Sequence, residues 1–297
     1  MRRNTVLFAA LALVVVLSGV ANAHLFGPNG EGNPYFAPAV PAAYVPSYDG
    51  DLGDWAWYPP AYTFTPDWFI AIGNFNEAEQ AVPKDDFDVI IYGPAWIPSE
   101  NKVTFAVQKV DDIFSTRSDN PQDSWDEDVI QFAIDADHGG EVRAPTDGLV
   151  AREYQQAFFT PKLGGSLGIY GAEDLAWSMA APHAFFGMLP EIVEGTTGTF
   201  TVEVQLSIWD HMDAAGADAS TLHQLAAGEI VGLSVEIIDT EEGVVEFPDV
   251  EFDFGSVSIG GEVLPDYYLM SEEETLPLIP TAVQSESWGR VKRALVQ

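Results

Sequence analysis

The sequence contains no cysteine, which excludes disulfide bonds, thiolate nucleophiles and metal or cluster sites ligated by cysteine. Basic residues are also few, since 12 Lys and Arg face 46 Asp and Glu and give a formal net charge of −34. A chain with this charge repels nucleic acid, because binding to a phosphate backbone requires a basic surface. We therefore expect no nucleic-acid partner.

Long apolar runs are missing everywhere except at the N-terminus. There, Arg2 and Arg3 precede an apolar run over 6–17 and a small-x-small motif, which is the pattern of a cleaved secretory signal. The run is short for a membrane span, which argues against an uncleaved anchor. We expect residues 1–23 to be a signal peptide and the mature chain to be extracellular or periplasmic, without a membrane span.

Helix-length apolar patterns are scarce, whereas alternation of apolar and polar residues recurs along the chain. In 200–208, five apolar residues alternate with four polar ones, as in a half-buried strand. Other strands are expected at 69–73, 87–92, 103–107, 130–134, 153–159, 166–170, 231–237 and 251–259. One short helix is expected over 220–227. The pattern predicts an all-β fold, an antiparallel two-sheet β-sandwich of jelly-roll type.

The chain divides by composition into three parts. After the signal peptide, residues 24–47 are rich in Gly and Pro and read as a lead-in arm. Residues 48–297 carry the strand patterns, and 47% of the whole chain is apolar, enough to build one sizeable core. We expect a single sandwich domain over 48–297.

Four segments, in order, resemble motifs of the family 9 carbohydrate-binding modules. They are YDGDLGDWAW at 48–57, NKVTFAVQKVDD at 101–112, WDEDVIQFAIDAD at 125–137 and TVEVQLSIW at 201–209. The chain departs from the family at Ser207, where proline is usual, and in the long stretch over 138–198. The resemblance implies a secreted, non-catalytic domain that binds a poly- or oligosaccharide and carries structural calcium.

Sugar sites combine aromatic rings, which stack on the apolar face of a sugar, with planar polar groups that bind its hydroxyls. The candidate stacking rings lie in loop-like segments and are Trp96, Trp125 and Trp177. The resemblance implies an arginine in the loop after the second motif, a place that Arg117 occupies. The further polar candidates are Asn120, Gln131, Tyr154 and Gln155.

Clusters of acidic residues suggest calcium, a hard cation that takes six to eight oxygen ligands. The candidate ligands are Asp49, Asp51, Asp54, Asp111, Asp112, Asp126, Asp128, Asp135 and Asp137. Two other interpretations stay open. The first three residues fit a solvated acidic turn, and the last two fit a cap on the turn at 138–140.

Several other functions stay open as alternatives. The chain has none of the common hydrolase, metalloprotease or nucleotide-binding motifs, so we expect no enzyme. Signal cleavage would leave His24 at the N-terminus, where a copper-binding histidine brace is conceivable. Haem could be held by Met and His residues that are close in sequence, namely Met179 with His183 or His211 with Met212. A self-assembling envelope or filament protein is the remaining alternative.

Overall fold

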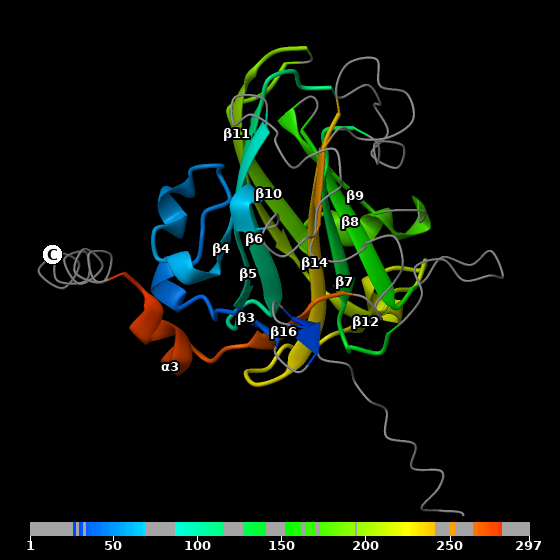
Figure 1. Ribbon diagram of the computed structural model, residues 1–297. Helices are drawn as coiled ribbons and strands as arrows, with labels where there is room; N and C mark the ends of the chain where they lie inside the picture. Colours follow the sequence, from blue (N-terminus) through cyan, green and yellow to red (C-terminus); the bar gives the residue numbers. More distant parts are fainter. Residues whose placement is uncertain are drawn as a thin grey trace, which may run out of the picture.

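The protein is a β-sandwich in the computed structural model (Figure 1), as the alternation of residues predicted. The structure describes residues 26–27, 30–31, 34–68, 87–115, 127–140, 152–161, 164–169, 173–193, 195–240, 250–253 and 264–280. Figure 1 shows β5, β6, β10 and β11 on one side of the molecule and β7, β8, β9 and β14 on the other. The predicted all-β sandwich is confirmed.

The first main sheet has five strands, each antiparallel to its neighbours. In spatial order they are β10 (Ala184–Leu189), β11 (Gly198–Leu206), β6 (Lys102–Asp111), β5 (Phe87–Ile97) and β4 (Thr63–Phe64). The alternating stretch over 200–208 forms most of β11, which pairs with β10 on one side and β6 on the other.

The second main sheet has seven strands. Six follow in the order β3 (Tyr35–Ala37), β16 (Asp266–Leu269), β14 (Ile230–Asp239), β7 (Ile130–Asp135), β8 (Tyr154–Thr160) and β9 (Ser166–Ile169). The seventh, β15 (Val250–Asp253), pairs with the far end of β14. All pairs are antiparallel except β3 with β16. Strand β3 lies in the stretch that we expected to be a lead-in arm, so these three residues belong to the sandwich.

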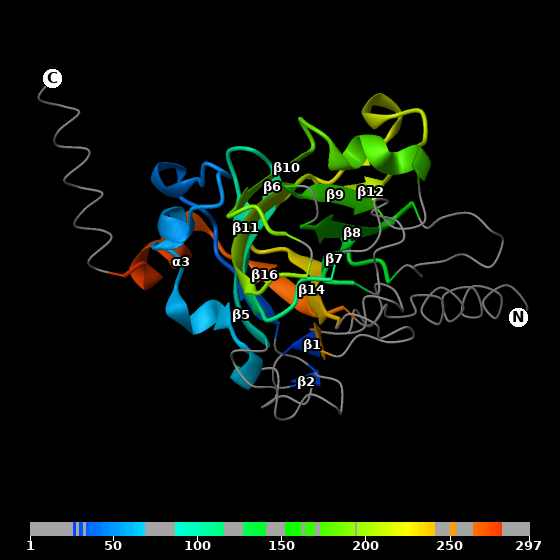
Figure 2. The ribbon, with the colours of Figure 1, turned by 90° about the horizontal axis from the view of Figure 1, so that it is seen from above.

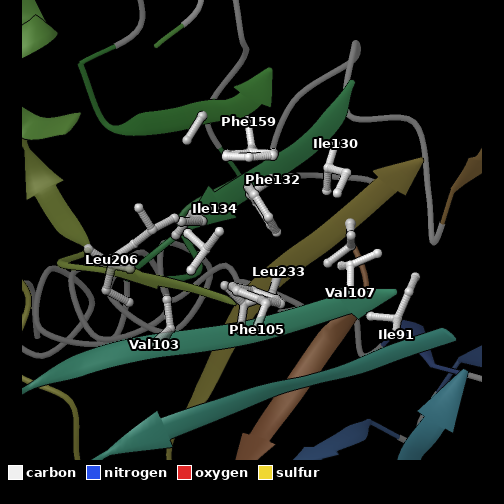
Figure 3. Close-up of a cluster of buried hydrophobic side chains, with 14 of the residues drawn as sticks. Ile91, Val103, Phe105, Val107, Ile130, Phe132, Ile134, Phe159, Leu206 and Leu233 are labelled. Carbon is white, nitrogen blue, oxygen red and sulfur yellow. The ribbon is translucent and has the colours of Figure 1, made fainter. Parts of the chain in front are cut away.

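The hydrophobic core fills the space between the two sheets (Figure 3). Inward-pointing residues of the two sheets meet there, for example Phe105 of β6 and Phe132 of β7, whose ring centroids are 4.9 Å apart. Their neighbours along the same strands, such as Val107 and Ile134, are at most 1% exposed. The side chains between these inward positions point outward, and one such set forms the candidate site.

The segment over 38–62, here called the entry segment, covers the outer face of the five-stranded sheet (Figures 1 and 2). Glu203, whose side chain points outward from β11, holds the entry segment on this face. The carboxylate of Glu203 accepts hydrogen bonds from the Trp55 indole at 2.8 Å and from the backbone N–H groups of Asp49 and Gly50 at 3.0 and 2.8 Å. Burial raises the pKa of this carboxyl. The first and last of the four sequence motifs are therefore joined by one buried side chain.

The remaining elements are short. They are the hairpins β1 (Phe26–Gly27) with β2 (Gly30–Glu31) and β12 (Trp209–His211) with β13 (Thr221–Leu222), the 3-10 helices η1 (Ala42–Tyr44), η2 (Leu52–Trp55), η3 (Pro60–Tyr62), η7 (Glu173–Met179), η8 (Ala217–Ala219) and η10 (Leu276–Leu278), and the helix α3 (Glu272–Thr275). Helix α3 lies beside the entry segment in Figures 1 and 2, and Ala39 donates a hydrogen bond to the Thr275 hydroxyl at 3.0 Å.

The helix predicted over 220–227 is wrong. Residues 221–222 form β13, and the next residues are held by the side chain of Asn101, which accepts a hydrogen bond from Leu225 N–H at 2.8 Å and donates one to the carbonyl of His223 at 2.7 Å. These backbone groups would bond within a helix, so the tertiary contact replaces it. The strand expected at 69–73 lies outside the described residues, as does 254–259 of the strand expected at 251–259.

Candidate functional site

A row of polar side chains lies on the outer face of the seven-stranded sheet, and we call it the polar row. Its members alternate with core residues along their strands and are Gln131 of β7, Gln156 of β8, and Ser234 and Glu236 of β14. Strand pairing brings them together, because Glu236 is the partner of Gln131 while Ser234 and Gln156 are both partners of Ala133. The register therefore gathers residues more than a hundred positions apart into one patch.

The polar row is buried, although it lies on the outside of the sandwich. Its four residues are each 1 to 5% exposed. The Gln156 amide donates a hydrogen bond to Oε1 of Gln131 at 2.7 Å, and Oε1 of Gln156 has no hydrogen-bond partner. A buried amide oxygen needs a donor, which in proteins is supplied by the chain, by water or by a ligand. The polar row thus contains a buried acceptor whose hydrogen-bonding capacity is unused.

Apolar residues of the same face lie beside the polar row in two clusters. One contains Val129, Phe158 and Ile238. The other contains Ala133, Tyr154 and Leu264. Amide and carboxylate groups flanked by apolar side chains suit a ligand that has hydroxyls on its edges and C–H groups on its faces.

The second candidate is an ionic cluster at one end of the core, here called the Lys109 cluster. It consists of Lys109, Asp111, Asp128 and Asp239, which are all at most 5% exposed. The Lys109 ammonium lies 2.6 Å from Oδ1 of Asp128, 2.7 Å from Oδ2 of Asp111 and 2.9 Å from Oδ1 of Asp239. It also donates to the carbonyl oxygen of Ile238 at 2.9 Å.

Burial and mutual repulsion shift the acid–base properties of this cluster. Burial alone would lower the pKa of Lys109, but the three carboxylates outweigh it and raise that pKa. Burial and the neighbouring carboxylates raise the pKa of Asp239 to about 9, and burial raises that of Asp128 to about 6. In Asp111 the contact with Lys109 outweighs burial and lowers the pKa. One lysine therefore balances only part of the negative charge that three buried carboxylates would carry.

The three carboxylates of the Lys109 cluster are spaced for a metal ion. One oxygen from each lies within 4.8 Å of the other two, and no other group of three or more such ligands does so among the described residues. The ammonium of Lys109, however, already contacts all three. The residues present therefore fit a cation in this place, and the cation that they hold is the lysine.

In the acidic stretch over 49–54 of the entry segment, the carboxylates accept hydrogen bonds from nearby backbone N–H groups. Asp49 accepts from the N–H of Asp51 and Asp51 from the N–H of Gly53, each at 2.9 Å, while Asp54 accepts from the N–H of Ser47 at 2.9 Å. These contacts match the turn interpretation of this segment. Among the other predicted calcium ligands, Asp111 and Asp128 belong to the Lys109 cluster, and Asp126 lies outside the described residues.

Asp135 and Asp137 hold the turn that follows β7. Asp135 accepts hydrogen bonds from the N–H groups of Gly139 and Gly140 at 3.1 and 2.9 Å, and Asp137 accepts one from Gly139 at 3.2 Å. Between them His138, with a positive φ of 57°, contacts the buried carboxylate of Asp266. Both Asp135 and Asp137 thus have the contacts of a turn cap.

We expect the His138–Asp266 contact to make stability depend on pH. The hydrogen bond to Asp266 raises the pKa of His138 above its usual 6.5, and Asp135 and Asp137 add to the rise. The folded state thus binds the proton more tightly, so this contribution is complete below about pH 6.5 and is lost as the pH rises through the folded pKa. Urea unfolding from pH 5.5 to 8.5 should show this loss.

Substituting His138→Asn should remove that pH dependence, because asparagine does not titrate in this range. The turn should be kept, because asparagine tolerates the left-handed backbone. His211→Asn is the matched control, since His211 is 41% exposed and lies 3.5 Å from Glu153. Equal slopes in wild type and His138→Asn would contradict the assignment.

Most of the described residues predicted to bind sugar are in the interior. Trp96 is 4% exposed and its indole donates to the carbonyl of Met270 at 2.8 Å. Tyr154 is 3% exposed on the face of the polar row, whereas Gln155 points into the sandwich and donates to the carbonyl of Ser207. Trp177 is half-buried, and its indole donates to the carbonyl of Asp213 at 3.1 Å. Arg117, Asn120 and Trp125 lie outside the described residues.

The residues proposed as haem ligands pack within the protein. Met179 and Met212 belong to the hydrophobic core, and the His183 ring contacts Trp177 and Trp209 edge to face at 5.4 and 5.2 Å. His24 lies outside the described residues.

Sequence reasoning missed Gln156, Ser234, Glu236, Lys109 and Asp239. For the last two a signal was available. Lys109 follows the inward residues of β6 at the same spacing of two, and Asp239 does so in β14. A charge in an inward position requires a buried partner.

The sequence matches no family model, and no curated protein matches it. Among solved structures, the chain is similar in fold to a family 9 carbohydrate-binding module from Caldicellulosiruptor kristjanssonii in complex with cellotriose, with a TM-score of 0.48 and 9% identity. The match covers 80% of this chain and 94% of that one. The same module in complex with glucose also has a TM-score of 0.48 and 9% identity, covering 80% of this chain and 95% of that one. In the part of the chain that the structure describes, no helix has the length and apolar character needed to cross a membrane.

Proposed function

We propose that the protein binds a neutral oligo- or polysaccharide without catalysis and that the polar row is the floor of its binding site. The observation that carries this proposal is the buried Gln131–Gln156 amide pair on the outside of a sheet, with Oε1 of Gln156 lacking a partner. Sugar hydroxyls both donate and accept hydrogen bonds, so they match an amide and a carboxylate side by side.

The charge of the chain narrows the class of saccharide. A net charge of −34 disfavours uronic and sulfated glycans for the same reason that it disfavours nucleic acid. The polar row adds no cation of its own, since its members are two glutamines, a serine and a glutamate. A neutral glycan is therefore the ligand that the site suits best.

The remaining parts of the proposal come from the sequence. The N-terminal pattern supports secretion, and the number of aromatic residues supports stacking, for which Trp125 and Trp177 are the proposed rings. Arg117 and Asn120, close to Trp125 in the sequence, are the proposed polar partners. Calcium is proposed only for acidic segments outside the described residues, such as the one around Asp126, because Lys109 fills the one described carboxylate group spaced for a metal.

A glycan array probed with the folded, processed protein tests the proposal. We expect binding to neutral oligosaccharides and weak or no binding to uronic and sulfated ones. Repeating the array in EDTA separates glycan binding from the calcium proposal. Size-exclusion chromatography of the same sample tests the self-assembly alternative. A folded monomer that binds no neutral glycan contradicts the proposed function.

A further inference from the structure

The Lys109 cluster has the ligand arrangement of a cation site. Four oxygens surround the ammonium, three from carboxylates and one from the carbonyl of Ile238, at 2.6 to 2.9 Å. Calcium takes the same classes of oxygen ligand at about 2.3–2.6 Å. The Nζ atom therefore lies where a hard divalent ion would lie if the side chain were absent.

The cluster joins the two sheets and the segments that leave them. Lys109 and Asp111 come from β6 of the five-stranded sheet, whereas Asp239 ends β14 and Asp128 precedes β7 in the seven-stranded sheet. Asp128 also accepts hydrogen bonds from the backbone N–H groups of Ser115 and Thr240. The cation at the centre thus holds together chain segments that are distant in sequence.

We propose that Lys109 is a covalently attached substitute for a divalent metal ion. The link that the Lys109 cluster makes between the two sheets, here called the clamp, is therefore independent of calcium. The ammonium is covalently attached and cannot be removed by a chelator, whereas a metal would have to displace it from three carboxylates. Removing the ammonium while leaving its space open converts the cluster into a divalent-cation site. This proposal concerns the clamp alone and does not depend on the glycan.

Two substitutions of the same lysine separate charge from space. Lys109→Ala removes the charge and opens room for an ion, whereas Lys109→Met removes the charge but fills most of the room. Thermal unfolding of wild type and both variants is measured in EDTA and in millimolar CaCl2. The calcium-induced shift of the wild type is the baseline, because it contains any contribution from acidic segments elsewhere.

We expect both variants to melt well below wild type in EDTA. Calcium should raise the melting temperature of Lys109→Ala by at least 5 °C more than that of wild type, and should leave Lys109→Met at the wild-type shift. Adding Asp128→Asn to Lys109→Ala should abolish the extra shift. Equal calcium shifts in wild type and Lys109→Ala would overturn the proposal, as would an extra shift that survives Asp128→Asn.

Lys109→Ala could fail to fold in EDTA, and the experiment then uses refolding yield. The unfolded variant is diluted into buffer with CaCl2, MgCl2 or EDTA, and native protein is quantified by size exclusion. Recovery with calcium and not with EDTA supports the proposal. Equal absence of native protein in all three, under conditions where Lys109→Met refolds, contradicts it.

Discussion

Replacing both Gln131 and Gln156 by alanine is expected to weaken glycan binding by about 30- to 150-fold. Each amide lost from a buried site removes a hydrogen bond to the ligand and leaves a sugar hydroxyl unpaired, at about 1–1.5 kcal/mol each. Two such losses amount to about 2–3 kcal/mol, and each 1.4 kcal/mol is a factor of ten in affinity. Isothermal titration with the best glycan from the array measures the effect.

Gln205→Ala is the matched control for this experiment. Gln205 is also a buried glutamine on an outer sheet face, 2% exposed, but it lies on the five-stranded sheet and is bonded to Lys102 and Glu100. Its loss should leave glycan affinity unchanged. Melting temperatures of all variants exclude unfolding as the cause. Wild-type affinity in the folded double variant would show that the polar row is not the binding floor.

The strands were predictable because their signal is local. In β11 the inward residues Phe200, Val202 and Val204 alternate with outward Thr201 and Glu203, and packing on one side is enough to produce that pattern. The polar row was predictable only in part. The alternation of β7 places Gln131 outward, but its neighbours Gln156 and Glu236 are set by the register of three strands, which no local pattern encodes.

The same contrast explains the wrong helix and the missed cluster. Leu222 and Leu225 have helical spacing, but hydrogen bonds to the distant Asn101 decide the conformation of 223–225. Lys109 stands at an inward position of a regular strand, and that local fact is visible in the sequence. The sequence does not show which acids contact Lys109, because Asp128 and Asp239 come from the other sheet.

Lys109→Met is expected to lower the free energy of unfolding by about 3–5 kcal/mol, the largest effect of any single substitution considered for this protein. Removing one partner of a buried ion cluster leaves the remaining charges without compensation, and this costs more than the pair itself contributes. Here three carboxylates, all at most 5% exposed, would lose their common cation. Urea unfolding at pH 7 measures the change from the transition midpoint at constant slope.

Lys102→Met is the matched control, since Lys102 lies on the same strand and is also buried, at 8% exposed. Its ammonium contacts the neutral Oε1 of Gln205 at 3.0 Å and lies 4.4 Å from the centre of the Phe185 ring. Its loss removes one hydrogen bond and one cation–π contact but leaves no cluster of carboxylates without a cation. We therefore expect the free energy of unfolding to fall by about 1 kcal/mol. Equal destabilisation by the two substitutions would mean that the three carboxylates add nothing to the role of Lys109. A cost for Lys109→Met below about 1 kcal/mol would mean that the three carboxylates take up protons easily once the ammonium is lost. Packing, and not the ion pairs, would then hold the clamp together.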